Sequence, residues 1–202
     1  MYPAIEPKRL SGEEMLLSPG GEAVGTLIDF WSWAYSDLVG NAERGALAEY
    51  IVACALQINH MDRIAWDKYD LLTQNGISVE VKTSGYLQTW EQQTLSKPIF
   101  GIQRTYGWDS KANKYDTEQR RQADIYVFCV HKHTDQATIN PLLISQWEFY
   151  LMPTVELDKN FGAQKTVTLS ALIRAGAEKC EYCNLKDRIY QICAEKSCFC
   201  PI

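Results

Sequence analysis

The sequence predicts an α/β domain, and three observations indicate this fold class. Apolar residues recur at helical spacing over residues 22–35 and again over residues 41–58. Asn75-Gly76 lies between alternating apolar residues, which is a signal for a β-hairpin. Residues 123–130 form a short run rich in β-branched and aromatic side chains, as expected for a buried strand. The chain of 202 residues is long enough for one such domain with a sizeable core.

The composition is that of an ordinary soluble globular chain, with 46% hydrophobic and 22% charged residues. The longest purely apolar runs are short, such as Ile51–Leu56, so we expect no membrane span. The chain begins without the basic-then-apolar order of a secretory signal, and a cytoplasmic location is therefore expected. The formal net charge of −5 gives no general attraction to nucleic acid, so such binding would need a local patch or a metal.

The first segment, residues 1–21, contains two prolines before a closing Pro-Gly-Gly and is predicted to be a flexible leader with little structure. A single domain is then expected over residues 22–202. Its first helix is predicted over residues 22–35. Phe30 and Trp33 widen the apolar face of this helix, which favours burial on more than one side.

A second helix is predicted over residues 41–58. Asn41 is a plausible N-cap and Glu43 lies in the first turn, where the helix dipole favours an acid. Glu49 lies about one turn after Gly45, where the missing side chain permits close approach of another backbone or of a substrate strand. Glu49 is thus a candidate site residue, and a solvated helical acid is the alternative.

The length of the loop at Asn75-Gly76 decides which way the charged side chains of the hairpin point. A two-residue loop would pair Asp70 with Val81 and would put a carboxylate on the buried face. A three-residue loop, Gln74–Gly76 with glycine in the left-handed conformation, pairs Asp70 with Glu80 and Tyr69 with Val81. The apolar set then faces a core: Tyr69, Leu71, Ile77, Val79 and Val81. The polar set shares the other face: Asp70, Ser78, Glu80 and Lys82.

Two carboxylates and an ammonium group on one strand pair have a chemical use. Adjacent carboxylates repel, and a hard cation such as Mg²⁺ relieves that repulsion while keeping several waters. Lys82 points the same way as Glu80 and would orient a metal-bound water or neutralise charge on a phosphate. These groups suit phosphodiester hydrolysis. The alternative is an exposed strand face on which Glu80 and Lys82 are solvated.

Residues 97–121 differ in composition from the rest of the chain. Their basic residues outnumber their acidic ones by three, and aromatic residues lie between them. Such a segment suits a phosphate backbone and stacked bases, and a solvated hairpin or long loop is the alternative. If residues 84–93 form a short helix, Gln88 and Gln92 lie one turn apart. They would then contact a base edge or, alternatively, be surface amides. The candidates for nucleic-acid binding are Arg44, Gln88, Arg104, Lys111, Lys114, Arg120 and Arg121.

The order of these residues resembles a known family. Arg44-Gly45-x3-Glu49 on a helix, then Asp70, then Glu80-Val81-Lys82 on a strand, is similar to the PD-(D/E)XK nuclease superfamily. The resemblance covers residues 41–84, and residues 123–130 follow where that fold has another core strand. Tyr69 replaces the proline of the superfamily's name, at a position that does not touch the chemistry.

The resemblance implies a restriction-endonuclease-like α/β fold with a mixed central β-sheet flanked by helices. It also implies a Mg²⁺-dependent nuclease, with Mn²⁺ as a substitute, acting on DNA, RNA being an alternative. Asp70, Glu80 and the Val81 carbonyl would be metal ligands, Lys82 the catalytic lysine, and Glu49 the helix acid that helps to hold metal or water. Enzymes of this fold often act in pairs, so a homodimer is an open alternative.

Two other interpretations compete with a nuclease. One is a catalytically inactive nucleic-acid-binding or structural module of the same fold, against which the complete Asp-Glu-Lys set argues. The other is a protein stabilised by structural zinc at Cys180, Cys183, Cys198 and Cys200. The second cysteine pair is one residue tighter than a usual zinc knuckle, so reduced cysteines are the favoured interpretation.

Overall fold

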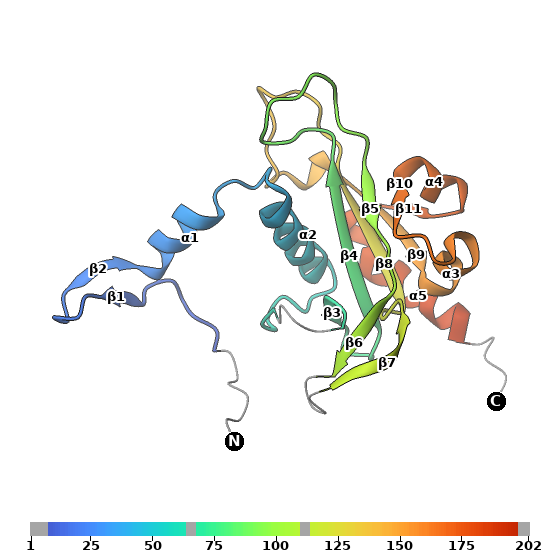
Figure 1. Cartoon of the computed structure of the whole chain (residues 1–202), viewed down its shortest axis with the longest axis horizontal. Coiled ribbons are helices and arrows are strands. Elements are labelled where there is room, and N and C mark those ends of the chain that lie inside the picture. The colour runs from blue at the N-terminus through green and yellow to red at the C-terminus, as the bar shows by residue number, and fades with distance from the viewer. Residues whose placement is uncertain (1–7, 64–67, 110–113, 198–202) are drawn as a thin grey trace.

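The structure is a computed structural model of the chain, and it describes residues 8–63, 68–109 and 114–197. Its centre is a five-stranded sheet with the strand order β11-β9-β8-β4-β3 (Figure 1). Strands β4 and β8 run parallel and the other neighbouring pairs run antiparallel, so the predicted mixed central sheet is confirmed. The strands of this sheet are β3 (Leu71–Leu72), β4 (Ser78–Gly85), β8 (Ile125–His131), β9 (Trp147–Pro153) and β11 (Glu178–Cys180).

Helices cover both faces of the sheet, which gives three layers. Helices α2 (Asn41–Ala55) and α5 (Leu185–Ser197) pack on one face. The other face is covered by α3 (Thr154–Phe161) and α4 (Leu169–Arg174), together with a small sheet of β5 (Ile99–Gly101) and β10 (Thr166–Thr168). Short 3₁₀ turns, η1 (Ile144–Gln146) and η2 (Tyr182–Asn184), precede β9 and α5. Within the described ranges, no helix is long and apolar enough to span a bilayer.

Strand β8 lies at the middle of the molecule, and all seven of its residues are buried. Alternate side chains belong to opposite cores, because successive residues of a strand point to opposite faces. Val127 packs with α2 and α5, whereas Phe128 packs with α3 and α4. The buried strand predicted over residues 123–130 is therefore confirmed, with bounds shifted by one or two residues.

The start of β4 is fastened to the start of β8. The backbone N–H and the hydroxyl of Ser78 donate to one carboxylate oxygen of Asp124, at 2.8 and 2.7 Å. The backbone N–H of Asp124 donates in return to the Ser78 hydroxyl, at 3.0 Å. This reciprocal contact fixes the register between the two parallel strands at the end where the predicted catalytic residues begin.

The basic segment forms a two-stranded hairpin of β6 (Thr105–Asp109) and β7 (Lys114–Arg120) outside the central sheet. Tyr106 and Tyr115 on this hairpin are 51% and 63% exposed. The Gln88–Gln92 stretch is not helical. Its amides bond to nearby backbone, as when the Gln88 N–H donates to the Gln92 side chain at 2.7 Å.

The second helix begins at residue 41 as predicted but ends at Ala55, three residues early. The prediction that Asn41 is its N-cap is wrong, because Gly40 occupies that position and Asn41 is the first helical residue. The Asn41 side chain instead accepts a hydrogen bond from the Arg44 guanidinium.

The N-terminal region differs from the prediction of a leader with little structure. Strand β1 (Met15–Leu17) pairs with β2 (Ala23–Thr26), and the Pro-Gly-Gly segment forms the turn between them. Residues 23–26 are taken up by this pairing, so helix α1 (Leu27–Tyr35) begins five residues later than predicted. Thr26 and Asp29 form a capping box at its start.

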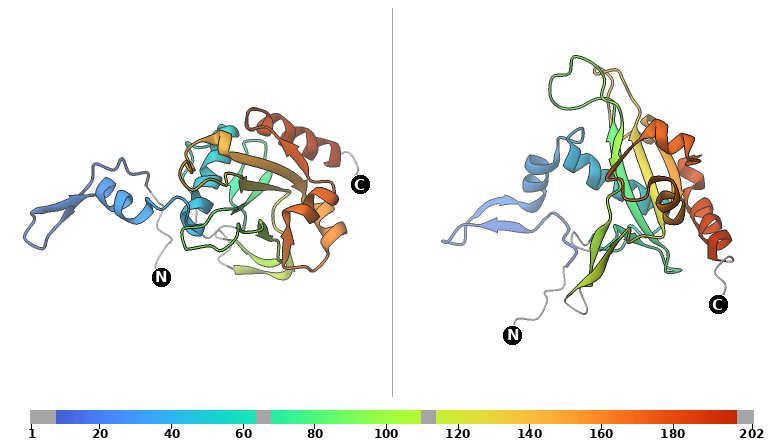
Figure 2. Two further views of the ribbon diagram at one scale, coloured as in Figure 1. Left: turned by 90° about the horizontal axis from the view of Figure 1, so that it is seen from above. Right: turned by 45° about the vertical axis from the view of Figure 1, so that its right-hand side comes forward.

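The prediction that the first helix is buried is also wrong. Helix α1 has no buried residue, and Trp33 is 85% exposed. We refer to residues 10–36, which contain β1, β2 and α1, as the N-terminal arm. The arm extends away from the three-layered body (Figure 2). Helical spacing of apolar residues predicted the helix but did not reveal that, among residues 8–63, 68–109 and 114–197, nothing buries its apolar face.

Candidate active site

The β3–β4 hairpin has the three-residue loop that the alternation of its side chains predicts. Leu71 lies opposite Val79 and Leu72 opposite Ser78, which is the register of a Gln74–Gly76 loop. The Thr73 N–H donates to the Ile77 carbonyl at 2.9 Å. Gly76 has a φ of +81°, so glycine is required at this position.

Asp70 lies just before β3 and its side chain folds onto β4. Its Oδ2 accepts a hydrogen bond of 2.7 Å from the backbone N–H of Val81. The N–H and C=O of one strand residue point to the same edge, so the Val81 carbonyl also faces Asp70. The prediction that Tyr69 and Leu71 face one core is wrong. Because the chain leaves the ladder before Leu71, Tyr69 packs on the α3–α4 side and Leu71 on the α2 side.

Glu80 and Lys82 project together from the face of β4 opposite Val79 and Val81. The Lys82 ammonium donates to Glu80 Oε1 at 2.6 Å. The Lys82 side chain is 32% exposed and the Glu80 side chain 18%. They line a cavity of about 450 Å³ that also receives Lys68, Gln103, Tyr126 and Lys165. The pair therefore lies at the edge of an open space rather than on a solvated strand face.

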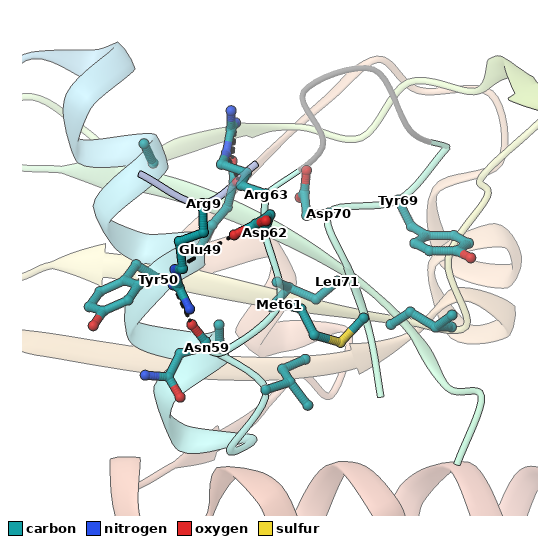
Figure 3. A pocket seen from close by; sticks show the side chains of 14 residues that line it. Arg9, Glu49, Tyr50, Asn59, Met61, Asp62, Arg63, Tyr69, Asp70 and Leu71 are labelled. Atoms are coloured by element: carbon teal, nitrogen blue, oxygen red, sulfur yellow. Dashed lines mark hydrogen bonds and ion pairs between the residues drawn. The ribbon is translucent and has the colours of Figure 1, made fainter. Parts of the chain in front are cut away.

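Glu49 reaches toward the same hairpin from α2. Its carboxylate accepts two hydrogen bonds from Arg63, 2.5 Å to Nε and 2.9 Å to Nη2. Glu49 and Asp70 line a second cavity, of about 320 Å³, whose other walls include Tyr50 and Met61 (Figure 3). A Cβ placed on Gly45 would lie 3.9 Å from Thr83, an ordinary contact, so packing does not require glycine there.

The three carboxylates interact electrostatically. Burial raises the pKa of Asp70 to about 7, and the charges of Glu80 and Glu49 add to that increase. The Val81 N–H and Lys82 act in the opposite direction. Burial lowers the pKa of Lys82, but Glu80, Asp70 and Glu49 outweigh burial and raise it above its ordinary value. The site thus holds clustered negative charge beside a protonated lysine.

The donor set at Asp70, Glu80, Glu49 and the Val81 carbonyl consists of oxygen atoms, which Mg²⁺ and Mn²⁺ prefer. Among the residues that the structure describes, no three His, Cys, Asp or Glu side chains already surround a common point as metal ligands would. The Glu80 carboxylate already accepts a hydrogen bond from Lys82, and the Glu49 carboxylate accepts one from Arg63. A cation would therefore displace these partners in part.

Arg44, a candidate for nucleic-acid contact, is 2% exposed. Its guanidinium donates to the carbonyls of Val39 and Leu87 at 3.1 and 3.2 Å. A Cβ on Gly85 would lie 2.9 Å from Arg44 Nη1, so the guanidinium passes directly over the end of β4. Gln88 lies beside it and donates to the Gly85 carbonyl at 3.1 Å. Arg44 therefore joins the loop before α2 to the loop after β4 inside the protein instead of facing a ligand.

Arg121 is also interior, with a side chain that has no exposed surface. It donates to the carbonyls of Ile102 and Gly162 at 2.8 and 3.0 Å and pairs with Asp158 at 2.5 Å. The chain turns inward just after β7 ends at Arg120, which the sequence did not reveal.

The remaining basic candidates include surface residues on and near the β6–β7 hairpin. Arg104 pairs with Asp158 at 2.9 Å and Arg120 with Asp116 at 3.2 Å, with arginine side chains 40% and 65% exposed. Lys114 is exposed at the start of β7. Lys111 lies outside the described residues.

The structure describes two of the four cysteines proposed as zinc ligands. Cys180 is buried in β11 and Cys183 is exposed, whereas Cys198 and Cys200 lie outside the described residues. The described pair is therefore split between the interior and the surface.

Arg63, Lys68, Tyr126 and Lys165 were not among the predicted site residues. Each reaches the site through tertiary structure, and no motif spacing connects them to the carboxylates. The parallel pairing of β4 with β8, which sets Tyr126 opposite Glu80, was the one signal available once both strands had been recognised.

The family model of bacteriophage T4 endonuclease IV matches residues 31–170, which is 140 of the 202 residues. The match includes Glu49, Asp70, Glu80 and Lys82, together with the β6–β7 hairpin. It begins inside α1 and leaves out β1 and β2. No curated protein matches the chain.

Proposed function

The chain belongs to the bacteriophage T4 endonuclease IV family, a nuclease family, and from this we propose that it is a metal-dependent deoxyribonuclease of the PD-(D/E)XK class. It would hydrolyse phosphodiester bonds in DNA, on a restriction-endonuclease-like fold. The arrangement of Asp70, Glu80 and Lys82 around Val81 carries this proposal. Three carboxylates with a lysine beside open cavities suit this reaction, and few other reactions need that set.

Mg²⁺, or Mn²⁺ in its place, fits the residues present. Burial, followed by the charges of Glu80 and Glu49, raises the pKa of Asp70, and a cation between these carboxylates would offset their repulsion. Asp70, Glu80 and the Val81 carbonyl would hold the ion, with Glu49 joining from α2. Such an ion would polarise the scissile phosphate and lower the pKa of a bound water.

The residues of the chain contribute the positioning. Glu80 holds the Lys82 ammonium 2.6 Å from its own carboxylate, so the lysine is available at the cavity to orient an attacking water and to offset charge at the phosphate. The Val81 N–H fixes the Asp70 carboxylate against β4. Arg104, Lys114 and Arg120 carry the exposed positive charge that would contact the phosphate backbone of DNA.

Lys82→Ala tests the proposal. We expect the purified protein to cut plasmid, linear duplex or single-stranded DNA in the presence of Mg²⁺ or Mn²⁺. EDTA should abolish this cleavage. Lys82→Ala should lower kcat by about 100-fold or more, because it removes a charge-stabilising donor. Lys159→Ala is the matched control, since Lys159 is 75% exposed on α3 and lies away from both cavities.

Equal cutting by the wild type and by Lys82→Ala would contradict the assignment of this site. DNA binding without cutting, in either metal, would instead identify an inactive binding module of the same fold. An RNA substrate in the same assay separates the two nucleic acids.

Arg63→Ala gives a second prediction, on metal affinity. Arg63 competes with a cation for Glu49, and its side chain is 53% exposed, so the ion pair is worth about 1 kcal/mol at most. Its removal should tighten Mn²⁺ binding by about five-fold, measured by titration calorimetry without DNA. Arg9→Ala is the control, because Arg9 lines the same cavity but bonds to Asn59 and His60 carbonyls. Weaker Mn²⁺ binding by Arg63→Ala would show that Arg63 does not compete with the cation for Glu49.

A further inference from the structure

The N-terminal arm has an uncovered apolar surface. Trp33 is 85% exposed, Met15 67%, and Leu16 and Val24 62% each. A monomeric protein seldom leaves so many large apolar side chains of one short segment in water, and such exposure marks an interaction site. The large apolar side chains of the arm that are exposed are Leu10, Met15, Leu16, Leu17, Val24, Ile28, Phe30, Trp33 and Tyr35.

The arm lacks a core of its own. Helix α1 has nine residues, and strands β1 and β2 have three and four. Isolated helices and two-stranded hairpins of this size are marginally stable in water. The capping box at Thr26 and the β1–β2 pairing fix its local geometry, but a covering surface is needed to stabilise it.

The described part of the body does not provide that cover. The arm is tied down at its base, where Arg9 donates to the carbonyls of Asn59 and His60 at 2.9 and 3.1 Å and pairs with Asp62. Beyond this anchor the arm extends outward in both views of Figure 2. Since no described residue of the body covers these side chains, a second molecule is the candidate for the covering surface.

The net charge of the arm limits which molecules could cover it. The N-terminal arm, residues 10–36, holds four acidic and no basic residues, a net of −4, whereas the rest of the chain has a net charge of only −1. No lysine or arginine occurs between residues 10 and 43. The arm is thus repelled by DNA and by another arm, whereas the nearly neutral body repels the arm little.

We propose that two copies of this chain associate by exchanging arms, so that the arm of each copy lies on the body of the other. The nine large apolar side chains of the arm, each 46% or more exposed, would bury about 100 Å² each, or about 900 Å² per arm. Two exchanged arms thereby exceed the roughly 800 Å² per partner of a stable interface. A second copy is present wherever the arm is, and a two-fold exchange covers both arms at once.

Sedimentation equilibrium and light scattering on the full chain, without DNA or metal, test this proposal independently of any nuclease activity. We expect the wild type to have twice its mass of 23.0 kDa. Trp33→Glu should weaken self-association at least about ten-fold, because a charge would be buried in the interface. Leu142→Glu is the matched control, since Leu142 is 65% exposed on the body, and it should remain dimeric.

Salt distinguishes exchange from simple pairing of the two arms. Arm-to-arm contact between like charges would tighten markedly from about 50 to about 500 mM salt as repulsion is screened, whereas arm-on-body contact should change little. Circular dichroism confirms that Trp33→Glu is folded. A monomeric wild type, a dimer that Trp33→Glu leaves unchanged, or a strongly salt-strengthened dimer would each overturn the proposal.

Discussion

Asp70→Asn is expected to abolish nuclease activity and at the same time to stabilise the metal-free protein above neutral pH. Asparagine retains an oxygen that accepts from the Val81 N–H but removes one of three mutually repelling carboxylates. Loss of a metal ligand should reduce kcat by about 100-fold or more. The folded-state pKa of Asp70 is raised from 3.8 to about 7, which corresponds to at most about 4 kcal/mol.

The pH dependence follows from the direction of that shift. Between pH 4 and 7 the folded state binds a proton that the unfolded state has lost, so stability falls as pH rises through this window. The gain from Asp70→Asn should therefore be full near pH 8, about 5 to 10 °C in Tm, and nearly absent near pH 4. Thermal unfolding at both pH values in EDTA measures it.

Mg²⁺ provides the control for this variant. Saturating Mg²⁺ should raise the Tm of the wild type, because the ion binds the folded state alone, and should leave Asp70→Asn unchanged. A gain in Tm that is equal at both pH values would indicate improved packing and not relief of charge repulsion. If Asp70→Asn has a lower Tm than the wild type at pH 8, the ionised Asp70 carboxylate does not destabilise the metal-free protein.

Arg121→Ala is expected to destabilise the fold by about 3 kcal/mol, or roughly 6 to 12 °C in Tm. The buried guanidinium satisfies the carbonyls of Ile102 and Gly162 and pairs with Asp158, and alanine would leave these acceptors without their donor. Urea unfolding followed by circular dichroism measures the loss.

Arg120→Ala is the matched neighbour of this variant. Arg120 is 65% exposed and pairs with Asp116 on the surface, so its removal should change stability by less than about 1 kcal/mol. It should instead weaken DNA binding and reduce its salt dependence. If Arg121→Ala is as stable as the wild type and loses DNA affinity, the interior position of Arg121 is contradicted.

The parts of the fold that were predictable are those in which local signals agree. Alternation around Asn75-Gly76 specified a three-residue loop, because a shift of one residue would have moved Asp70 onto the buried face. The uninterrupted apolar run of β8 predicted a strand buried on both faces. These two features were sufficient to place the candidate carboxylates beside the central sheet.

The other features depend on contacts between distant segments. Arg120 and Arg121 are adjacent and chemically identical, yet one is at the surface and the other is enclosed by residues of α3 and of the loop that follows it. Arg63 meets Glu49 across a loop that carries no motif. The uncovered face of α1 has the same apolar spacing as a core helix, so periodicity could not distinguish a helix covered by its own chain from one left uncovered.

The fastening of β4 at its two ends has a consequence for how the site responds to a substrate. Asp124 holds the strand at Ser78, and Arg44 lies across Gly85, so the segment between them resists sliding or bending. Glu80 and Lys82 are thus presented at fixed positions before any ligand arrives, and the reorganisation that accompanies binding is reduced. Adaptation to different substrates would be left to the long side chains of Glu49 and Arg63, which can rotate without moving the backbone of β4.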